Sequence, residues 1–429
     1  MNRPTLFLIL AWTLTGAACD DDETRFAVTS RPSDATVAGA LYSYQVTTPT
    51  LASGAGYELL TAPTGLSLDR SGLVQWTPAL DQLGTHVVTI RVSSGFQHAV
   101  QTWNLRVHQG VALGVTLSPR GHTASSTEAD VAQHFAPDAS FGSLRAFHTH
   151  WRDAVTADGE VPAQADFAAT SAANHGFTLA VVVGWHDRDG SPDLTSEATP
   201  GDNSWRNDET RQEFLAMVET FAGTYRPAFL LLGDETNAYF VTHSQADWDA
   251  WISEFAVCYD AIKAASPSTV VGTTFQLERM KGGGARAGWS DPAHWDLIDD
   301  HAASGKIDTV AFHSYPYFDH DTPSALPADY YREISTHWSG PVTFAQVGWL
   351  TAPSGPFPGS EADQAEFVDV FFERSAGLDL RYVAWRYLHD WDEEATVEPY
   401  VGVGLRSNDG SVIRAADARW AHAVALRQR

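Results

Sequence analysis

The stretch Ala228-Phe-Leu-Leu-Leu-Gly-Asp-Glu-Thr-Asn237 decides the fold, because it passes from an unbroken apolar run directly into Gly-Asp-Glu. Such a run is typical of a strand that is buried on both faces of a parallel sheet. Similar runs recur along the chain from Ala112 to Trp385, with longer stretches between them. The predicted strands are Ala112–Leu117, Ser143–His148, Thr178–Gly184, Ala228–Leu232, Val270–Thr274, Thr309–His313, Val342–Ala345 and Tyr382–Trp385.

The stretches between these runs have helical periodicity. One predicted helix carries Trp248, Trp251 and Phe255 on an apolar stripe, and Cys258 continues that stripe as a buried, inert thiol. Another is predicted to begin after Ser360 as its N-cap. Eight strand–helix units over residues 110–429 predict an α/β TIM barrel, (β/α)8. A doubly wound sheet is the alternative, but no glycine-rich phosphate loop follows the first strand.

Residues 26–109 alternate apolar and polar side chains and predict a small all-β immunoglobulin-like sandwich. Tyr42, Tyr44 and Val46 share one face of a predicted strand, and turn sequences separate the runs. The segment APTGLSLDRSGLVQWTPALDQLGTHVVTIRVSSG resembles the immunoglobulin-like, cadherin-like modules of bacterial surface proteins. The resemblance implies a spacer, with Trp76 as a core anchor.

The N-terminus predicts export. Residues 1–18 contain Arg3, an apolar run from Leu6 to Leu14 that is too short to span a bilayer, and small residues before Cys19. This resembles a bacterial lipoprotein signal peptide, which implies that Cys19 is lipidated and anchors the protein to a membrane, at the cell surface or in the periplasm. An ordinary secretory signal is the alternative. Residues 19–25 read as a solvated acidic tether.

The overall composition narrows the partners. The 429 residues include 53 acidic and 27 basic side chains, a net charge of −26, so the chain should repel nucleic acid. Two cysteines, Cys19 and Cys258, exclude a disulfide framework and a thiolate metal cluster. We expect a monomer that needs no cofactor.

Polar and aromatic residues stand where the predicted barrel strands end, and in a barrel these ends carry the chemistry. Indole rings stack on the C–H faces of sugars, while Asp, Arg and His bind sugar hydroxyls. The strand ends therefore predict a site for a polysaccharide or oligosaccharide. The candidate substrate-binding residues are Asp234, Arg145, His148, Trp185, His313, Tyr315, Trp349 and Trp385.

As an ordered set, these strand ends resemble the clan A glycoside hydrolases, in particular endo-galactanase-like and cellulase-like barrels. The resemblance implies that Glu235, after the fourth strand, is the general acid/base. It implies that Tyr315 orients a nucleophile from the seventh strand and that Trp385 forms the floor of the sugar-binding site. Two positions depart from the pattern: Asp234 replaces the usual Asn, and Gln346 replaces the nucleophilic Glu.

Gln346 leaves more than one hypothesis for the function, because an amide cannot form the usual glycosyl ester. One hypothesis is a hydrolase of β-linked glycan that takes its second carboxylate from elsewhere. Asp234 lies beside Glu235, but adjacent strand residues point to opposite faces, so we expect weak coupling between them. The other hypotheses are a glycan-binding pseudoenzyme and a structural surface protein. The candidate second carboxylates are Asp234, Asp187, Glu278, Asp319 and Asp390.

A metal site is an alternative interpretation of the histidines. His148 and His150 are two residues apart, and His186 and His313 follow other strands, together with Asp187. Sugar binding explains the same residues, and the His-x-His pair follows the second strand rather than the first. We therefore expect no metal.

Overall fold

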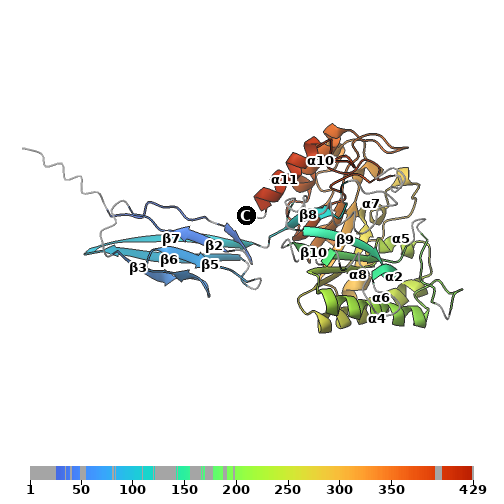
Figure 1. Ribbon diagram of the computed structural model, residues 1–429, viewed down its shortest axis with the longest axis horizontal. Coiled ribbons are helices and arrows are strands. Elements are labelled where there is room, and N and C mark those ends of the chain that lie inside the picture. Colours follow the sequence, from blue (N-terminus) through green and yellow to red (C-terminus); the bar gives the residue numbers. More distant parts are fainter. Residues whose placement is uncertain are drawn as a thin grey trace, which may run out of the picture. The chain divides into compact units, whose positions relative to one another are not determined.

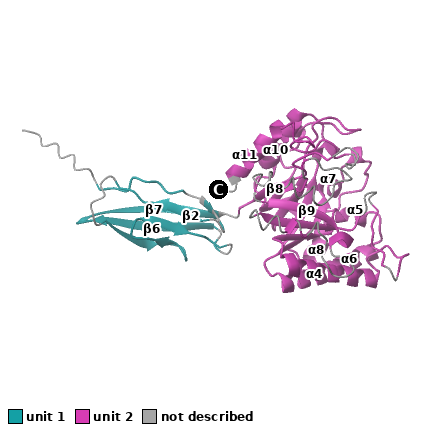
Figure 2. Ribbon diagram, viewed as in Figure 1, with its two compact units in different colours: residues 1–109 teal, residues 110–429 magenta. Residues whose placement is uncertain are grey.

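The computed structural model describes residues 26–427 except 34, 39–40, 49–54, 80–81, 83, 109, 119, 121–141, 143, 155–165, 167, 170–176, 187–190, 197–198 and 392–398. The predicted signal peptide, Cys19 and the acidic tether lie outside these residues. The chain divides into two compact units, Met1–Gln109 and Gly110–Arg429 (Figure 2). No helix in the described part of the chain is long and apolar enough to cross a membrane.

The first unit is the predicted β-sandwich. One sheet has the order β1-β7-β6-β3 and the other β2-β5-β4. All pairings are antiparallel except that of β1 with β7, which is parallel. Trp76 is 2% exposed, and its indole N–H donates to the Thr64 carbonyl, which confirms it as a core anchor. The strands are β1 (Ala35–Val37), β2 (Tyr42–Gln45), β3 (Gly56–Thr61), β4 (Ser67–Leu68), β5 (Leu73–Trp76), β6 (Gly84–Ser94) and β7 (Gln97–His108).

The second unit is the predicted barrel: eight parallel strands close in the order β10-β11-β12-β13-β14-β15-β8-β9 (Figure 1). Each predicted apolar run forms one strand, and several strands extend one or two residues beyond the prediction. The strands are β8 (Ala112–Thr116), β9 (Leu144–His150), β10 (Thr178–Gly184), β11 (Phe229–Leu232), β12 (Val270–Gln276), β13 (Thr309–Ser314), β14 (Val342–Val347) and β15 (Leu380–Trp385).

Helices surround these strands, and the two expected ones are present. The helix α6 carries the Trp248 stripe with Cys258 fully buried, and Ser360 caps α10 by accepting a hydrogen bond from the Asp363 amide. The helices are α2 (Trp151–Ala154), α4 (Asp208–Tyr225), α5 (Thr236–Phe240), α6 (Gln245–Ala265), α7 (Leu277–Met280), α8 (Asp296–Ala303), α9 (Ile334–His337), α10 (Glu361–Arg374) and α11 (Ala415–Arg427). Three 3-10 turns are η3 (Ala285–Ala287), η4 (Pro316–Phe318) and η5 (Pro323–Ala325).

Strand alternation separates two cores. Small side chains with Leu144, Leu231 and Tyr382 fill the barrel interior, whereas larger aliphatic and aromatic side chains pack between the strands and the helices. In β15, Tyr382 and Ala384 point inward, while Val383 and Trp385 point toward the helices. This period of two decides which residues at each strand end can reach the mouth of the barrel.

One buried histidine makes stability depend on pH. His301 on α8 is fully buried against Phe255 and Phe275, and neither ring nitrogen has a hydrogen-bond partner. Burial lowers its pKa from 6.5 to about 3. Between these values the unfolded chain binds a proton that the folded chain excludes. The free energy of unfolding should therefore fall as the pH decreases, by up to about 1.4 kcal/mol per pH unit.

Replacing this ring tests that account. The variant His301→Leu removes the titrating group and keeps an apolar side chain, so its stability should fall less steeply between pH 6.5 and pH 4. Urea unfolding across this range measures the difference, with His422→Leu on an exposed position of α11 as the control. Parallel pH slopes for wild type and His301→Leu would contradict the assignment.

Candidate active site

The turn after β11 has an unusual backbone. Gly233 has φ +86°, and Glu235 has φ +53°, a left-handed conformation that non-glycine residues seldom adopt. The neighbouring strand β12 holds the turn, because the Glu235 amide donates to Thr274 Oγ1 at 2.7 Å. Asn237 and Gln276 add a reciprocal pair of hydrogen bonds at 2.9 and 3.0 Å. Such strain held by its surroundings is typical of a functional position.

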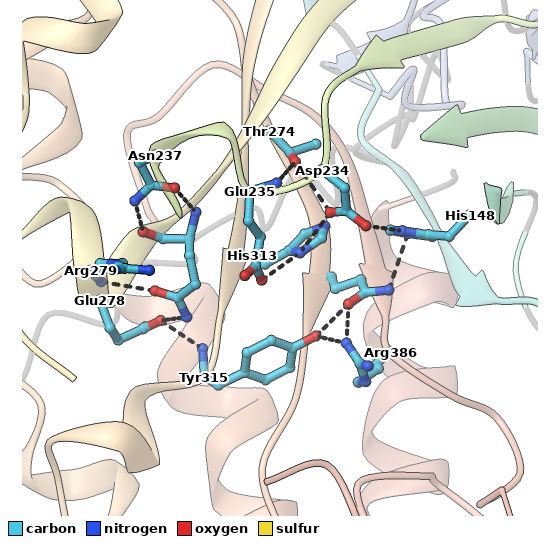
Figure 3. Close-up of polar contacts among 12 residues, drawn as sticks. His148, Asp234, Glu235, Asn237, Thr274, Glu278, Arg279, His313, Tyr315 and Arg386 are labelled. Atoms are coloured by element: carbon cyan, nitrogen blue, oxygen red, sulfur yellow. Dashed lines mark hydrogen bonds and ion pairs between the residues drawn. The ribbon is translucent and has the colours of Figure 1, made fainter. Parts of the chain in front are cut away.

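This backbone brings two adjacent carboxylates together. His313 Nδ1, on β13, lies 3.0 Å from Glu235 Oε1 and 3.4 Å from Asp234 Oδ1 (Figure 3). A hydrogen on Nδ1 serves both oxygens. The expectation that Asp234 and Glu235 point to opposite faces is therefore wrong, because the turn has left strand geometry before these residues. Their side chains are 33% and 22% exposed, so both are partly buried and still reachable from solvent.

Asp234 is held in its charged form. Burial alone would raise its pKa, but His313 and His148 beside it outweigh burial and hold the pKa below its usual range. His148 Nδ1 lies 3.5 Å from Asp234 Oδ2, and Thr274 Oγ1 lies 3.4 Å from Asp234 Oδ1. Asp234 is therefore an ionised acceptor beside Glu235.

Gln346, on β14, belongs to the same network. Its Oε1 accepts hydrogen bonds from the Tyr315 hydroxyl at 2.5 Å and from Arg386 Nη1. Its Nε2 lies 3.1 Å from His148 Nε2 and donates to it. An amide N–H can donate only to a ring nitrogen without hydrogen, so His148 is neutral and turns its Nδ1 hydrogen toward Asp234. Burial, which lowers the pKa of His148, favours the same neutral form.

Arg386 is the site residue that the sequence analysis missed. It follows Trp385 at the end of β15, and its guanidinium bonds Gln346 and Tyr315 and lies 3.7 Å from the centre of the Tyr400 ring. Its position follows the inward face of Tyr382 and Ala384. Extending that alternation by two residues past Ala384 would have identified it.

Four predicted sugar-binding residues lie elsewhere. Trp185, Trp349 and Trp385 are fully buried between strands and helices, and Trp385 packs against Phe367 and Trp420. Arg145 is 1% exposed near the start of β9, where it bonds the Leu144 carbonyl. These side chains are packing residues in this structure. The structure does bring together Glu235, Gln346, Asp234, His148, His313 and Tyr315.

Trp185 supports the site from behind. A Cβ added at Gly233 would lie 2.7 Å from the Trp185 ring and 2.2 Å from Thr236 Cγ2. Trp185 itself contacts Trp205 at a centroid distance of 4.9 Å and Trp251 at 4.5 Å. The Gly233 turn therefore rests directly on an aromatic cluster.

Three of the candidate second carboxylates, Glu278, Asp319 and Asp390, are held in structural contacts. Glu278 is 1% exposed and accepts from Ser314, the Tyr315 amide, Gln276 and Tyr330. Burial raises its pKa. Asp319 accepts from the Gly284 and Ala285 amides, and Asp390 accepts from the Gly404 amide and pairs with Arg414. Asp187 lies outside the described residues.

His148, Asp234 and His313 could together hold a metal ion, since one ligand atom from each lies within 4.8 Å of the others. Two imidazoles and a carboxylate suit zinc. In the structure the same atoms form hydrogen bonds and close polar contacts with one another and with Glu235. Hydrogen bonds alone therefore account for the arrangement of these side chains.

Comparison with known proteins supports both units. Residues 25–108 match the family described as Putative Ig domain (He_PIG). The barrel resembles glycoside hydrolase structures. A GH5_18 protein from Bifidobacterium longum has a TM-score of 0.56 and 15% identity, over 75% of this chain and 80% of that one. A family 39 glycoside hydrolase from Bacteroides cellulosilyticus has a TM-score of 0.52 and 14% sequence identity, over 93% of this chain and 83% of that one.

An exo-β-1,4-mannosidase from an Opitutaceae bacterium has a TM-score of 0.53 and 15% identity, over 75% of this chain and 60% of that one. No curated protein matches the sequence. The fold is therefore an immunoglobulin-like module followed by a barrel of the glycoside hydrolase type, as the sequence predicted. At these identities the likeness concerns the fold alone.

Neighbouring residues on β15 should respond differently to mutation. Trp385→Phe should lower the free energy of unfolding by about 2 kcal/mol through a buried void and leave glycan affinity unchanged. Arg386→Met keeps an apolar stem beside Tyr400 but removes the donors to Gln346 and Tyr315. Glycan affinity should therefore weaken at least tenfold, which corresponds to a loss of roughly 1.4 kcal/mol of binding free energy. Thermal unfolding and calorimetric titration with oligosaccharide separate the two effects. Equal losses of affinity would place Trp385 in contact with the sugar.

Proposed function

We propose that this protein is a carbohydrate-active enzyme that hydrolyses a β-linked polysaccharide or oligosaccharide, with Glu235 as general acid/base. The observation that carries the proposal is the convergence of Glu235 and Asp234 on His313 Nδ1 at the carboxyl-terminal mouth of the barrel. The fold likeness to glycoside hydrolases agrees with this assignment but does not by itself establish an activity.

The surroundings of Glu235 suit proton transfer to a glycosidic oxygen. Its side chain is partly exposed, so a substrate can reach it, and its backbone is fixed by Thr274. His313 orients its carboxyl oxygen at hydrogen-bond distance. Asp234 lies beside it as an ionised hydrogen-bond acceptor. A general acid needs a fixed geometry and access to the substrate.

A glycan-binding protein without catalysis is the second candidate, and Gln346 favours it. A neutral amide at this position supplies neither a nucleophile nor a negative charge for an oxocarbenium ion. In that case the same residues would bind the sugar through hydrogen bonds, and no bond would break.

A conservative substitution separates the two candidates. Glu235→Gln keeps the side-chain shape and removes the acid, so release of reducing ends from β-linked polysaccharides should fall by about 10²–10⁴-fold. Glycan affinity, measured by calorimetry, should change little. Ser253→Ala on an exposed position of α6 serves as the control. If wild type releases no reducing ends from any polysaccharide but binds one of them, the binding function replaces hydrolysis.

We also propose that Cys19 is lipidated, that the protein is anchored to a bacterial membrane, and that the immunoglobulin-like module acts as a spacer. The supporting features are the short apolar run, the small residues before Cys19 and the acidic segment after it. Labelling of growing cells with a radioactive fatty acid should mark the wild type and not Cys19→Ser. Equal labelling of Cys258→Ser and wild type is the expected control result, and an unlabelled wild type would contradict anchoring.

A further inference from the structure

The search for a nucleophile starts from what faces Glu235. A direct displacement needs a carboxylate, or a base that activates water, on the face of the sugar away from the leaving group. Among the described residues, Glu278, Asp319 and Asp390 are bound in structural contacts, and Gln346 is neutral. Asp234 shares one imidazole nitrogen with Glu235, so the two carboxylates act from the same side. The candidate carboxylates among the described residues therefore leave the attack to another group.

We propose that this group belongs to the substrate, and that the site cleaves a β-linked 2-acetamido-2-deoxyhexoside by attack of the acetamido oxygen on its own anomeric carbon. Asp234 binds the acetamido N–H, and Glu235 protonates the leaving oxygen. The inference rests on the proposed hydrolase function and names its substrate class. Substrate assistance of this kind replaces the nucleophilic carboxylate in some glycosidases.

The spacing of the two carboxylates fits such a substrate. Glu235 Oε1 and Asp234 Oδ1 lie 3.0 and 3.4 Å from the same nitrogen, so their separation cannot exceed the sum of those distances. The leaving oxygen on C1 and the nitrogen on C2 are substituents of neighbouring ring carbons. Because Glu235 and Asp234 converge on one point, one of them can reach the leaving oxygen and the other the nitrogen. Two acids placed for direct displacement instead lie on opposite faces of the sugar, about 5–9.5 Å apart.

The charges fit the chemistry as well. Attack by the acetamido oxygen produces an oxazolinium ion, whose positive charge is shared with nitrogen, and an ionised carboxylate beside that nitrogen stabilises it. Asp234 supplies this charge, because its two histidine neighbours keep it ionised. A carboxylate at position 346 would repel the partly negative carbonyl oxygen of the acetamido group. Gln346 is neutral and does not.

Gln346 has a defined orientation for this role. Tyr315 and Arg386 hold its Oε1, which fixes Nε2 on the side of His148. An amide nitrogen carries two hydrogens, and one of them is engaged by His148 Nε2. His148 in turn contacts Asp234 at 3.5 Å. Gln346 is therefore a positioning residue for Asp234, and the substitution of the usual Glu is part of the arrangement.

The bonds balance over two steps. In the first, the acetamido oxygen forms a bond to C1 while the glycosidic C1–O bond breaks, and the leaving oxygen takes the proton of Glu235. The acetamido N–H is hydrogen-bonded to Asp234 throughout. In the second step, water attacks C1 and gives a proton to Glu235, while the C1–oxygen bond of the oxazolinium ring breaks. The acetamido group is restored, and C1 keeps its original configuration.

Matched substrates test the inference. The full chain is assayed on 4-nitrophenyl N-acetyl-β-glucosaminide and β-glucoside, on the corresponding galactose pair, and on oligomers of N-acetylglucosamine and of glucose. We expect cleavage of the acetamido member of a pair at a rate at least a hundredfold above its hydroxyl member. Cleavage of hydroxyl substrates alone would overturn the inference and leave the proposed hydrolase intact. Failure on all substrates, including the polysaccharides, would overturn both.

Two variants and one analogue sharpen the result. Asp234→Asn should lower kcat on the acetamido substrate about a hundredfold. It should also abolish calorimetric binding of the thiazoline analogue of N-acetylglucosamine, a readout that does not depend on turnover. Gln346→Glu should lower activity on the acetamido substrate; a gain on hydroxyl substrates instead would indicate a decayed direct displacement. Proton NMR of the first product should show retention, and inversion would overturn the proposal.

Discussion

The candidate active site of this barrel depends on one backbone turn. The positive φ angles of Gly233 and Glu235 redirect the chain as it leaves β11, and this is why two consecutive side chains reach His313 Nδ1. An extended continuation of the strand would have sent one of them toward the helices. Contacts from β12, through Thr274 and Gln276, hold the turn in this conformation. One local constraint therefore determines which groups can act together on a substrate.

The fold could be predicted from the sequence, because each apolar run is long enough to define a buried strand and the runs are regularly separated. The structure also places Glu235, His313 and Tyr315 at the ends of the strands to which the sequence assigned them, while their roles stay a prediction. The tryptophans were wrongly predicted to face the sugar, because the prediction used the residue types at the strand ends and not the alternation of side chains along each strand. Val183 and Val383 face the helices, so Trp185 and Trp385, two residues later, face them too. The backbone of Glu235 could not be foreseen, because a left-handed glutamate has no signature in a single sequence.

Gln346 shows how an amide differs from a carboxylate in a hydrogen-bond network. A carboxylate only accepts, whereas an amide accepts at one end and donates at the other. Here the accepting end meets Tyr315 and Arg386, and the donating end meets His148. The hydrogen bonds of Gln346 therefore link the cation at Arg386, through His148, to the anion at Asp234.

The aromatic support of the Gly233 turn has an evolutionary consequence. Gly233 has no room for a side chain because Trp185 and Thr236 fill the space, and Trp185 is itself enclosed by Trp205 and Trp251. Single substitutions in this group would disturb either the packing or the turn, while compensating pairs could preserve both. Change at these positions should therefore be correlated among descendants of this protein, and drift in the core and drift in the active site would not be independent.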